Sequence, residues 1–503
     1  MASSHLSSII AGLVLVVLLT KYLQRLFFHP LSKFPGPAVA AVSHLWEFWH
    51  DWIQDGTFLE GVADLHKRYK SSVVRIAPNH LHVNDVEVYH QVFKVNTNFY
   101  KAPYFYEAFG FATSIATITN PHRHKPLRTT IAGMFTGTAV DGMSDEMYDM
   151  VRKATDVVAA RSSKAGNQFN VMHFLRCITT DVSCELIFGE TLDLVNNGYY
   201  SDRFLSNLDT FVENVWIMVH APWIAQFALM LPNTLTDKIV PGYAYFREQC
   251  IQWIDRVRAR RAKGITQMRN GRPTLFDVLL EDNPDKNYKV PSNSDLIDQA
   301  FLFAIAGTDT TSTATTFAIF FVLSNPRVLQ RLREELRGAS AIIKDEYNYR
   351  EVRKLPYLTA VIKESLRMSS PFPGRLPRVV PPEGMQLNKK FVPGGTILSI
   401  SSRVIMDDPE LYPEPEKFLP ERWMGENAKS MDRNMIAFGK GSRSCLGTNL
   451  AWLKMYTMIS TLFSRWDLRL VSPTGPKLDY RDHALIEMKS QVVVEILKDH
   501  WAN

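Results

Sequence analysis

A single cysteine on a glycine-punctuated loop is the residue of this sequence best suited to do chemistry. Cys445 lies between Gly441 and Gly447, and a long apolar helical pattern follows over residues 450–463. A thiol at the start of a helix is favoured as thiolate, because the helix dipole and the free backbone N–H groups attract negative charge. The two glycines would let the backbone approach a flat ligand where a Cβ would clash.

Two side chains close to this thiol in the sequence suit a flat ligand that carries carboxylates. Arg443 can pair with such a carboxylate, and Phe438 can cover the sulfur and keep water away from it. Together with the thiolate, these residues suit axial ligation of haem iron. The alternative is a buried structural cysteine in a glycine-rich turn.

A second group of polar residues interrupts a long apolar pattern over residues 295–323. The stretch 301–306 is apolar on every face, which is typical of a buried helix, and Ser294 can cap its N-terminus. Asp309 and Thr310 come directly after this stretch, and the glycine before them lowers helix propensity by about 1 kcal/mol relative to alanine. A threonine-rich kink without chemistry is the alternative.

A third signal is a charged pair on an amphipathic helix that begins near Leu355. Glu364 and Arg367 are spaced i,i+3 and therefore lie side by side. Taken alone, such a pair is usually solvated and contributes about 0.2–0.5 kcal/mol. Arg422 follows downstream in the segment 418–423.

In their order along the chain, from the stretch 295–323 to the Cys445 loop, these segments resemble the cytochrome P450 family. The pattern F-x-x-G-x-R-x-C-x-G over residues 438–447 matches the family at every fixed position, and five such positions make a chance match rare. The resemblance covers essentially the whole chain. It implies a mostly helical fold with small β-sheets (α+β), haem b as the cofactor and Cys445 as the axial ligand. Short strands are expected at 72–76, 81–83 and 396–400.

The resemblance also assigns roles to the other charged residues. Asp309 and Thr310 match the acid–alcohol pair that delivers protons when the family cleaves dioxygen, which requires protons in a pocket otherwise closed to water. Glu364, Arg367 and Arg422 would form a Glu–Arg–Arg cluster behind the haem. That cluster is structural in the family, so we assign it to folding and haem retention.

The haem carboxylates need partners, and the resemblance suggests four. Arg443 is the first. Arg128 lies at the spacing of the family's W-x-x-x-R arginine, and His124 stands where tryptophan is commonest. Arg378 resembles an arginine on the first sheet that also reaches a propionate. The segment 404–409 lacks the histidine that related chains often carry, which weakens any further donor there.

The N-terminus reads as a membrane anchor. Residues 1–20 contain no Asp, Glu, Lys or Arg, and with its flanks to Leu23 the apolar stretch reaches about 20 residues, enough to cross a bilayer. Lys21 and Arg25 follow it, so the positive-inside rule places the body in the cytosol. A cleaved signal peptide is the alternative, against which stands the absence of a basic n-region. We therefore expect a transmembrane anchor (1–23), a proline-containing linker (24–40) and a haem-thiolate monooxygenase domain (41–503).

Composition limits the remaining function classes. The chain has 503 residues with 46% hydrophobic content and no linker-like shift beyond the first forty, which favours one large catalytic domain. Its four cysteines contain no C-x-x-C spacing, which argues against zinc or iron–sulfur binding, and so few cysteines suit a reducing compartment. The net charge of +6 comes without a basic stripe interleaved with aromatics, so we expect no nucleic-acid partner.

The resemblance and the N-terminal anchor together imply a monooxygenase of the endoplasmic reticulum membrane, single-pass, with a cytosolic catalytic domain. It would take electrons from NADPH–cytochrome P450 reductase, with cytochrome b5 as a further candidate donor, and would contact membrane lipid. Its substrate would be an apolar small molecule, such as a terpenoid, polyketide or alkaloid intermediate of fungal secondary metabolism. The expected pocket segments are mostly apolar: 99–115, 204–231, 301–306, 371–376 and 484–486. A haem-thiolate isomerase or dehydratase without net oxygen insertion, and a non-catalytic haem-binding protein, are the alternatives.

Overall fold

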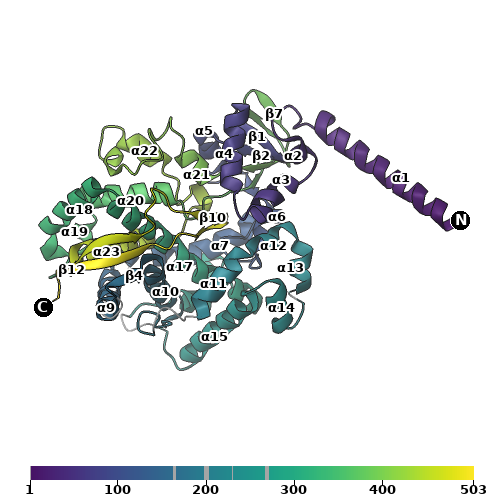
Figure 1. Cartoon of the computed structure of the whole chain (residues 1–503). Helices are drawn as coiled ribbons and strands as arrows, with labels where there is room; N and C mark the ends of the chain where they lie inside the picture. Colours follow the sequence, from purple (N-terminus) through teal and green to yellow (C-terminus); the bar gives the residue numbers. More distant parts are fainter. Residues whose placement is uncertain (1, 163–165, 198–202, 229, 267–270, 503) are drawn as a thin grey trace.

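One long buried helix organises the protein. The structure is a computed structural model that describes residues 2–162, 166–197, 203–228, 230–266 and 271–502. The helix α17 (Asn293–Ser324) has 32 residues, most of them buried, and runs through the middle of the body (Figure 1). Its cap is Ser292, whose side chain accepts a hydrogen bond from the Asp295 N–H, so the expectation that Ser294 caps it was wrong.

The helices that hold the candidate site pack around α17. They are α10 (Val171–Phe188), α15 (Tyr243–Ala262), α20 (Pro356–Ser369) and α23 (Thr448–Arg465). The apolar patterns that predicted helices near residue 355 and over 450–463 are confirmed as α20 and α23. One hydrophobic core extends through all of these helices.

Further helices surround these five. Those of at least seven residues are α4 (Phe58–Tyr69), α5 (Val86–Val92), α7 (Pro121–Ile131), α9 (Ser144–Ser162), α11 (Arg203–Glu213), α13 (Pro222–Ala228), α14 (Asn233–Ile239), α18 (Pro326–Gly338) and α22 (Ala428–Asn434). The others are α2 (Ala38–Val42), α3 (Leu45–Phe48), α6 (Pro103–Tyr106), α8 (Gly137–Asp141), α12 (Val215–His220), α16 (Leu275–Leu279), α19 (Tyr349–Val352) and α21 (Ser402–Met406). Short helical turns include η4 (Ala132–Phe135), η7 (Pro420–Trp423) and η8 (Gly441–Arg443).

The strands form small sheets. The largest has the order β1-β2-β8-β5-β3, and within it only β2 and β8 pair in parallel. Its strands are β1 (Val73–Ala77), β2 (His80–Val83), β8 (Ile397–Ser399), β5 (Arg378–Val379) and β3 (Tyr100–Lys101). The three expected strands are thus confirmed as β1, β2 and β8, with no end shifted by more than one residue. The other strands are β4 (Gln168–Asn170), β12 (Val493–Asp499) and β9 (Trp466–Ser472), β10 (Tyr480–His483) with β11 (Leu485–Met488), and β6 (Met385–Leu387) with β7 (Lys390–Val392).

The N-terminal helix α1 (Ala2–Leu23) projects away from the body (Figure 1). In the ranges that the structure describes, no helix meets the combined requirement of length and apolarity for crossing a membrane. The segment after α1 packs onto the body, because Arg25 donates a hydrogen bond to the Val42 carbonyl at 2.6 Å and Leu31 and Phe34 are buried.

The expected Glu–Arg–Arg cluster is present, and its Glu364–Arg367 pair is fully buried. Glu364 accepts hydrogen bonds from Arg367 at 2.9 and 3.0 Å, from Arg422 at 3.1 Å and from the Trp423 indole at 2.9 Å. Glu364 and Arg367 are 0% exposed, so this is no solvated helix pair. The cluster joins α20 to η7. The chain continues from η7 to the loop that carries Cys445.

Replacing Glu364 by glutamine should destabilise the fold strongly. It removes the negative charge that two buried arginines share, and breaking a buried pair costs about 3–5 kcal/mol. Denaturant unfolding of the haem-loaded protein measures this. The matched control is Glu351→Gln, which breaks an exposed i,i+3 pair with Lys354 and should cost less than about 1 kcal/mol. Equal losses in the two variants would contradict a structural role for the cluster.

Candidate active site

Cys445 occupies the turn between η8 and α23. Its backbone N–H donates to the Phe438 carbonyl at 2.8 Å, and the Thr448 hydroxyl donates to its carbonyl at 3.0 Å. These bonds fix the loop that carries the thiol. The side chain of Cys445 is solvent-accessible, whereas Cys177, Cys184 and Cys250 are buried.

The Cys445 thiol is accessible yet lies in densely packed protein. Burial raises its pKa above the usual range, while the Gly447 N–H, the Thr448 hydroxyl and the Arg128 charge act in the opposite direction. In the loop alone, burial thus opposes the thiolate and these three groups favour it. A bound metal ion deprotonates a coordinating thiol outright.

The two glycines of the loop, Gly441 and Gly447, differ in the space around them. Gly441 has a φ of +70°, and a Cβ there would meet the Lys94 carbonyl oxygen at 2.7 Å. Its close approach is thus to the Phe93–Lys94 backbone rather than to a ligand, contrary to the expectation. A Cβ on Gly447 would meet nothing within 4 Å, so the space beside this residue is open.

A cationic wall lies beside the Cys445 loop. Arg128 on α7 donates to the Ser444 carbonyl at 2.8 Å, and Arg443 donates to the Ile118 carbonyl at 2.8 Å. Arg378 donates to the Tyr106 hydroxyl at 2.7 Å. A cavity of about 310 Å³ is lined by these three arginines together with His124, Lys101 and other residues. The structure thus brings together all four residues that the resemblance suggested as carboxylate partners.

The described residues supply no counter-ion to the cations of this wall. Among them, none of Lys101, Arg128, Arg378 and Arg443 forms an ion pair with a carboxylate, and the oxygens that accept from them are neutral. Burial, followed by the charges of Arg443, Lys101 and Arg128, lowers the pKa of His124 to about 3. Burial and the Arg378 charge lower the pKa of Arg443 to about 10. A ligand with two carboxylates would relieve this repulsion, so the residues present fit haem and its propionates.

Lys101 is a member of this wall that the sequence did not identify. It is buried on β3, and its ammonium contacts the Ala116 carbonyl and lies 4.2 Å from the centre of the Tyr106 ring. Nothing in the sequence around Lys101 indicates that this lysine is buried. The pairing of β3 with β5 brings it beside Arg378.

On α17, Thr310 lies on an accessible strip of an otherwise buried helix. Its hydroxyl donates to the Ala306 carbonyl at 2.9 Å, and Ala306 itself is exposed. One turn earlier, the Phe303 ring stacks on Phe135, whose carbonyl accepts from Asn449 at the start of α23 at 2.8 Å. These contacts connect the strip to the helix that follows Cys445.

Asp309 points away from Thr310 and toward α10. Its carboxylate forms an ion pair with Arg176 at 2.7 Å, and Arg176 also pairs with Asp209 on α11 at 2.7 Å. Burial raises the pKa of Asp309, and the Arg176 charge opposes that rise. The expected acid–alcohol pair is adjacent in sequence, but its two side chains have different partners.

Packing against α10 explains why residue 307 is a glycine. A Cβ there would lie 2.6 Å from the Ser183 Cβ, so only glycine lets α10 and α17 approach this closely. The glycine in the polar interruption of the helix is thus explained by the neighbouring helix.

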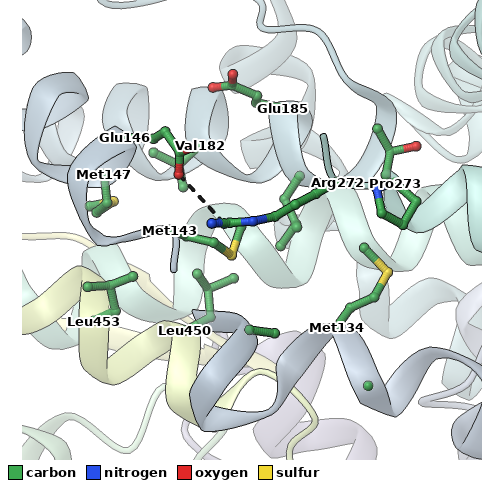
Figure 2. Close-up of a pocket in the computed structure, with 14 residues that line it drawn as sticks. Met134, Met143, Glu146, Met147, Val182, Glu185, Arg272, Pro273, Leu450 and Leu453 are labelled. Atoms are coloured by element: carbon green, nitrogen blue, oxygen red, sulfur yellow. Dashed lines mark ion pairs between the residues drawn. The ribbon is translucent and has the colours of Figure 1, made fainter. Parts of the chain in front are cut away.

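A second cavity, of about 340 Å³, lies between α9, α10 and α23 (Figure 2). Met134, Met143 and Met147 line it, and an ion pair of 3.7 Å between Arg272 and Glu146 crosses it. None of the candidate site residues contributes to its lining, so this cavity is separate from the candidate active site.

The accessible cysteine, the cationic wall and the helical fold define a haem-thiolate protein, and comparison with known proteins agrees. The chain belongs to the cytochrome P450 family, whose profile matches residues 41–494. It is 88% identical over 492 residues to the cytochrome P450 monooxygenase aneF of Aspergillus aculeatus, covering 98% of this chain and 99% of that protein. It is 34% identical over 477 residues to the cytochrome P450 monooxygenase phqM of Penicillium fellutanum, covering 94% of this chain and 88% of that protein.

A third relative is the cytochrome P450 monooxygenase cloA of Claviceps purpurea, 32% identical over 486 residues and covering 96% of this chain and 94% of that protein. The chain is therefore a haem-thiolate monooxygenase with haem b as its cofactor, a small-molecule substrate and a redox partner. The family and reaction class expected from the Cys445 motif are confirmed.

Proposed function

We propose that Cys445 is the axial ligand of haem b in a monooxygenase that acts on an apolar small molecule. The observation that carries this proposal is the accessible Cys445 thiol beside a cationic wall to which the described residues supply no carboxylate partner. When bound, the haem supplies the oxidising chemistry. The chain's own residues hold the haem, shape the pocket and move protons.

The cationic wall would hold the two propionates. Arg128, Arg378 and Arg443 each keep a neutral hydrogen-bond acceptor in the structure, so turning toward a carboxylate replaces a weak partner by a charged one. His124 is neutral at physiological pH because its pKa lies near 3, and a neutral imidazole can still donate one N–H.

Thr310 would present its hydroxyl to the reacting pocket, and Asp309 would supply protons. Arg176 holds both Asp309 and Asp209, and the Asp209 side chain is 51% exposed. If Asp309 takes up a proton or turns toward Thr310, Arg176 keeps Asp209 as its partner. The cation is thus never left buried without a counter-charge, which keeps the cost of releasing Asp309 low.

The substrate pocket would be walled by aromatic side chains. Phe301 on α17 packs against Phe111 and Phe211 with ring centres 5.2 Å apart in both pairs. Three expected pocket segments, 99–115, 204–231 and 301–306, therefore meet at Phe301. The segment 371–376 is less apolar than expected, because Arg375 is buried there in an ion pair with Glu47 at 3.1 Å. We propose an apolar scaffold of the terpenoid, polyketide or alkaloid kind from fungal secondary metabolism.

Labelled dioxygen tests this function against the isomerase or dehydratase alternative. The chain and a reductase are expressed in a fungal host under heavy-isotope dioxygen, and the metabolites are compared with those of a Cys445→Ser strain. We expect a product that carries one labelled oxygen atom per oxidation and is absent from the variant strain. A product that depends on Cys445 but contains no label would contradict oxygen insertion.

We also propose that α1 anchors the enzyme in the endoplasmic reticulum membrane, with the body in the cytosol. Its side chains from Leu13 to Leu19 are exposed and apolar, and 22 residues of helix extend about 33 Å, compared with a hydrocarbon core of about 30 Å. NADPH–cytochrome P450 reductase, and cytochrome b5 as a further candidate, would dock on the same cytosolic side.

Deleting residues 2–23 should release much of the protein from membranes while the haem stays bound. This deletion spares Arg25, which ties the linker to the body. Some membrane retention should persist, because Trp223 and Phe227 on α13 are 71% and 59% exposed and can contact lipid. Membrane fractionation and the haem spectrum measure both effects. A mature chain that begins after about residue 20–40 would instead establish a cleaved signal peptide.

A further inference from the structure

A lysine without an acidic partner is buried among the helices of the active site. Lys454 lies on α23 and is 1% exposed. Its Nζ donates to the Ser183 hydroxyl at 2.7 Å, to the Thr179 carbonyl at 3.2 Å and to the Gly307 carbonyl at 3.2 Å. No carboxylate within the described ranges pairs with it. Its partners all belong to α10 and α17.

The three acceptors match the three N–H groups of an ammonium. The Ser183 hydroxyl can accept from Lys454 because its own hydrogen is donated to the Thr179 carbonyl at 2.6 Å or the Gly307 carbonyl at 3.0 Å. Burial lowers the pKa of Lys454 to about 7. The geometry thus satisfies the charged form, although the buried surroundings oppose it.

Through these bonds, Lys454 acts on the backbone of α17 just before its functional turn. The Gly307 carbonyl receives Lys454 and Ser183, and the next carbonyl, that of Thr308, receives the Thr179 hydroxyl at 2.7 Å. These external donors bind this part of the α17 backbone to α10 and α23. Asp309 and Thr310 follow immediately.

We propose that Lys454 is a positioning residue that fixes the turn of α17 carrying Asp309 and Thr310 relative to the helix that follows Cys445. Lys454 touches neither substrate nor haem in this account. It acts through the Gly307 carbonyl, and so sets where Thr310 presents its hydroxyl. The catalytic consequence rests on the proposed function of Thr310, whereas the mechanical link between α23 and α17 does not.

Hydrogen exchange on the full-length, haem-loaded protein tests the mechanical link. Lys454→Met keeps the chain length of the side chain and removes its donors. The amides of residues 304–312 should exchange about tenfold faster, as expected for a lost hydrogen bond from a charged group, while those of α20 should not change. Ser183→Ala should accelerate the same amides, and the double variant should add little beyond either single variant. Met455→Leu, a buried neighbour on α23, is the control and should leave the exchange of residues 304–312 unchanged.

The two levels of the proposal fail separately. Unchanged exchange over residues 304–312 in Lys454→Met, or equal acceleration in α20, would overturn the positioning role. With the exchange changed as expected, NADPH-dependent peroxide release should also rise in Lys454→Met, while the spectrum of the reduced carbon monoxide complex stays that of the wild type. Unaltered peroxide release would reject the link to Thr310 and leave the assignment of Cys445 untouched.

Discussion

Replacing Cys445 by serine should abolish both the thiolate spectrum and monooxygenase activity. Serine has nearly the same size, but its hydroxyl is a hard, weakly acidic ligand that cannot donate electron density as a thiolate does. The reduced protein with carbon monoxide should therefore lose the long-wavelength absorption that is diagnostic of a thiolate ligand. Haem binding should weaken, with the cationic wall retaining part of it.

The other cysteines provide the matched controls for this prediction. Cys177, Cys184 and Cys250 are 2%, 1% and 0% exposed in the core, and burial raises the pKa of Cys184 and Cys250 above the usual range. Serine at Cys177 or Cys250 should leave the spectrum in place. A thiolate spectrum that survives in Cys445→Ser and disappears in Cys250→Ser would show that the ligand was assigned wrongly.

Thr310→Ala should uncouple electron consumption from product formation. The Thr310 hydroxyl lies on the accessible strip of α17 and donates to the Ala306 carbonyl, and alanine is well tolerated in a helix. NADPH consumption should persist and hydrogen peroxide should rise. Oxygenated product per NADPH should fall by about 10²–10⁴-fold, the scale of a lost proton-transfer group.

Thr315→Ala is the control for this effect. Thr315 is buried on the same helix and donates to the carbonyl of Thr311 at 2.8 Å, so it has the same chemistry without access to the pocket. It should change coupling little. Product formation that is unchanged in Thr310→Ala, without added peroxide, would reject proton delivery through Thr310 and favour the isomerase alternative.

The structural features that the sequence predicted correctly depend on residues close together in the chain. Neighbouring residues in the chain determine each of these features: the motif around Cys445, the apolar helices α17, α20 and α23, and the strands β1, β2 and β8. The cap of α17 shows the limit of such reasoning. Ser292, Asn293 and Ser294 are all good capping residues, and only the chain's path decides that Ser292 accepts the hydrogen bond.

The contacts that the sequence did not predict join residues far apart in the chain. Arg176 holds Asp309, and Lys454 holds the Gly307 carbonyl, but neither partner can be identified from spacing on one helix. Gly441 was assigned to a ligand because its conformational freedom was evident while its neighbour, the Phe93–Lys94 backbone, was not. Pattern reasoning identifies residue types suited to chemistry, and the packing of distant helices decides which partners they have.

X-ray absorption at the iron edge of the full-length, haem-loaded protein shows directly whether Cys445 binds the iron. We expect four porphyrin nitrogens and one sulfur in the first shell of the wild type. That sulfur should be absent from Cys445→Ser and retained in Cys250→Ser. A first shell without sulfur in the wild type, or a sulfur retained in Cys445→Ser, would contradict the assignment of Cys445 as the haem ligand.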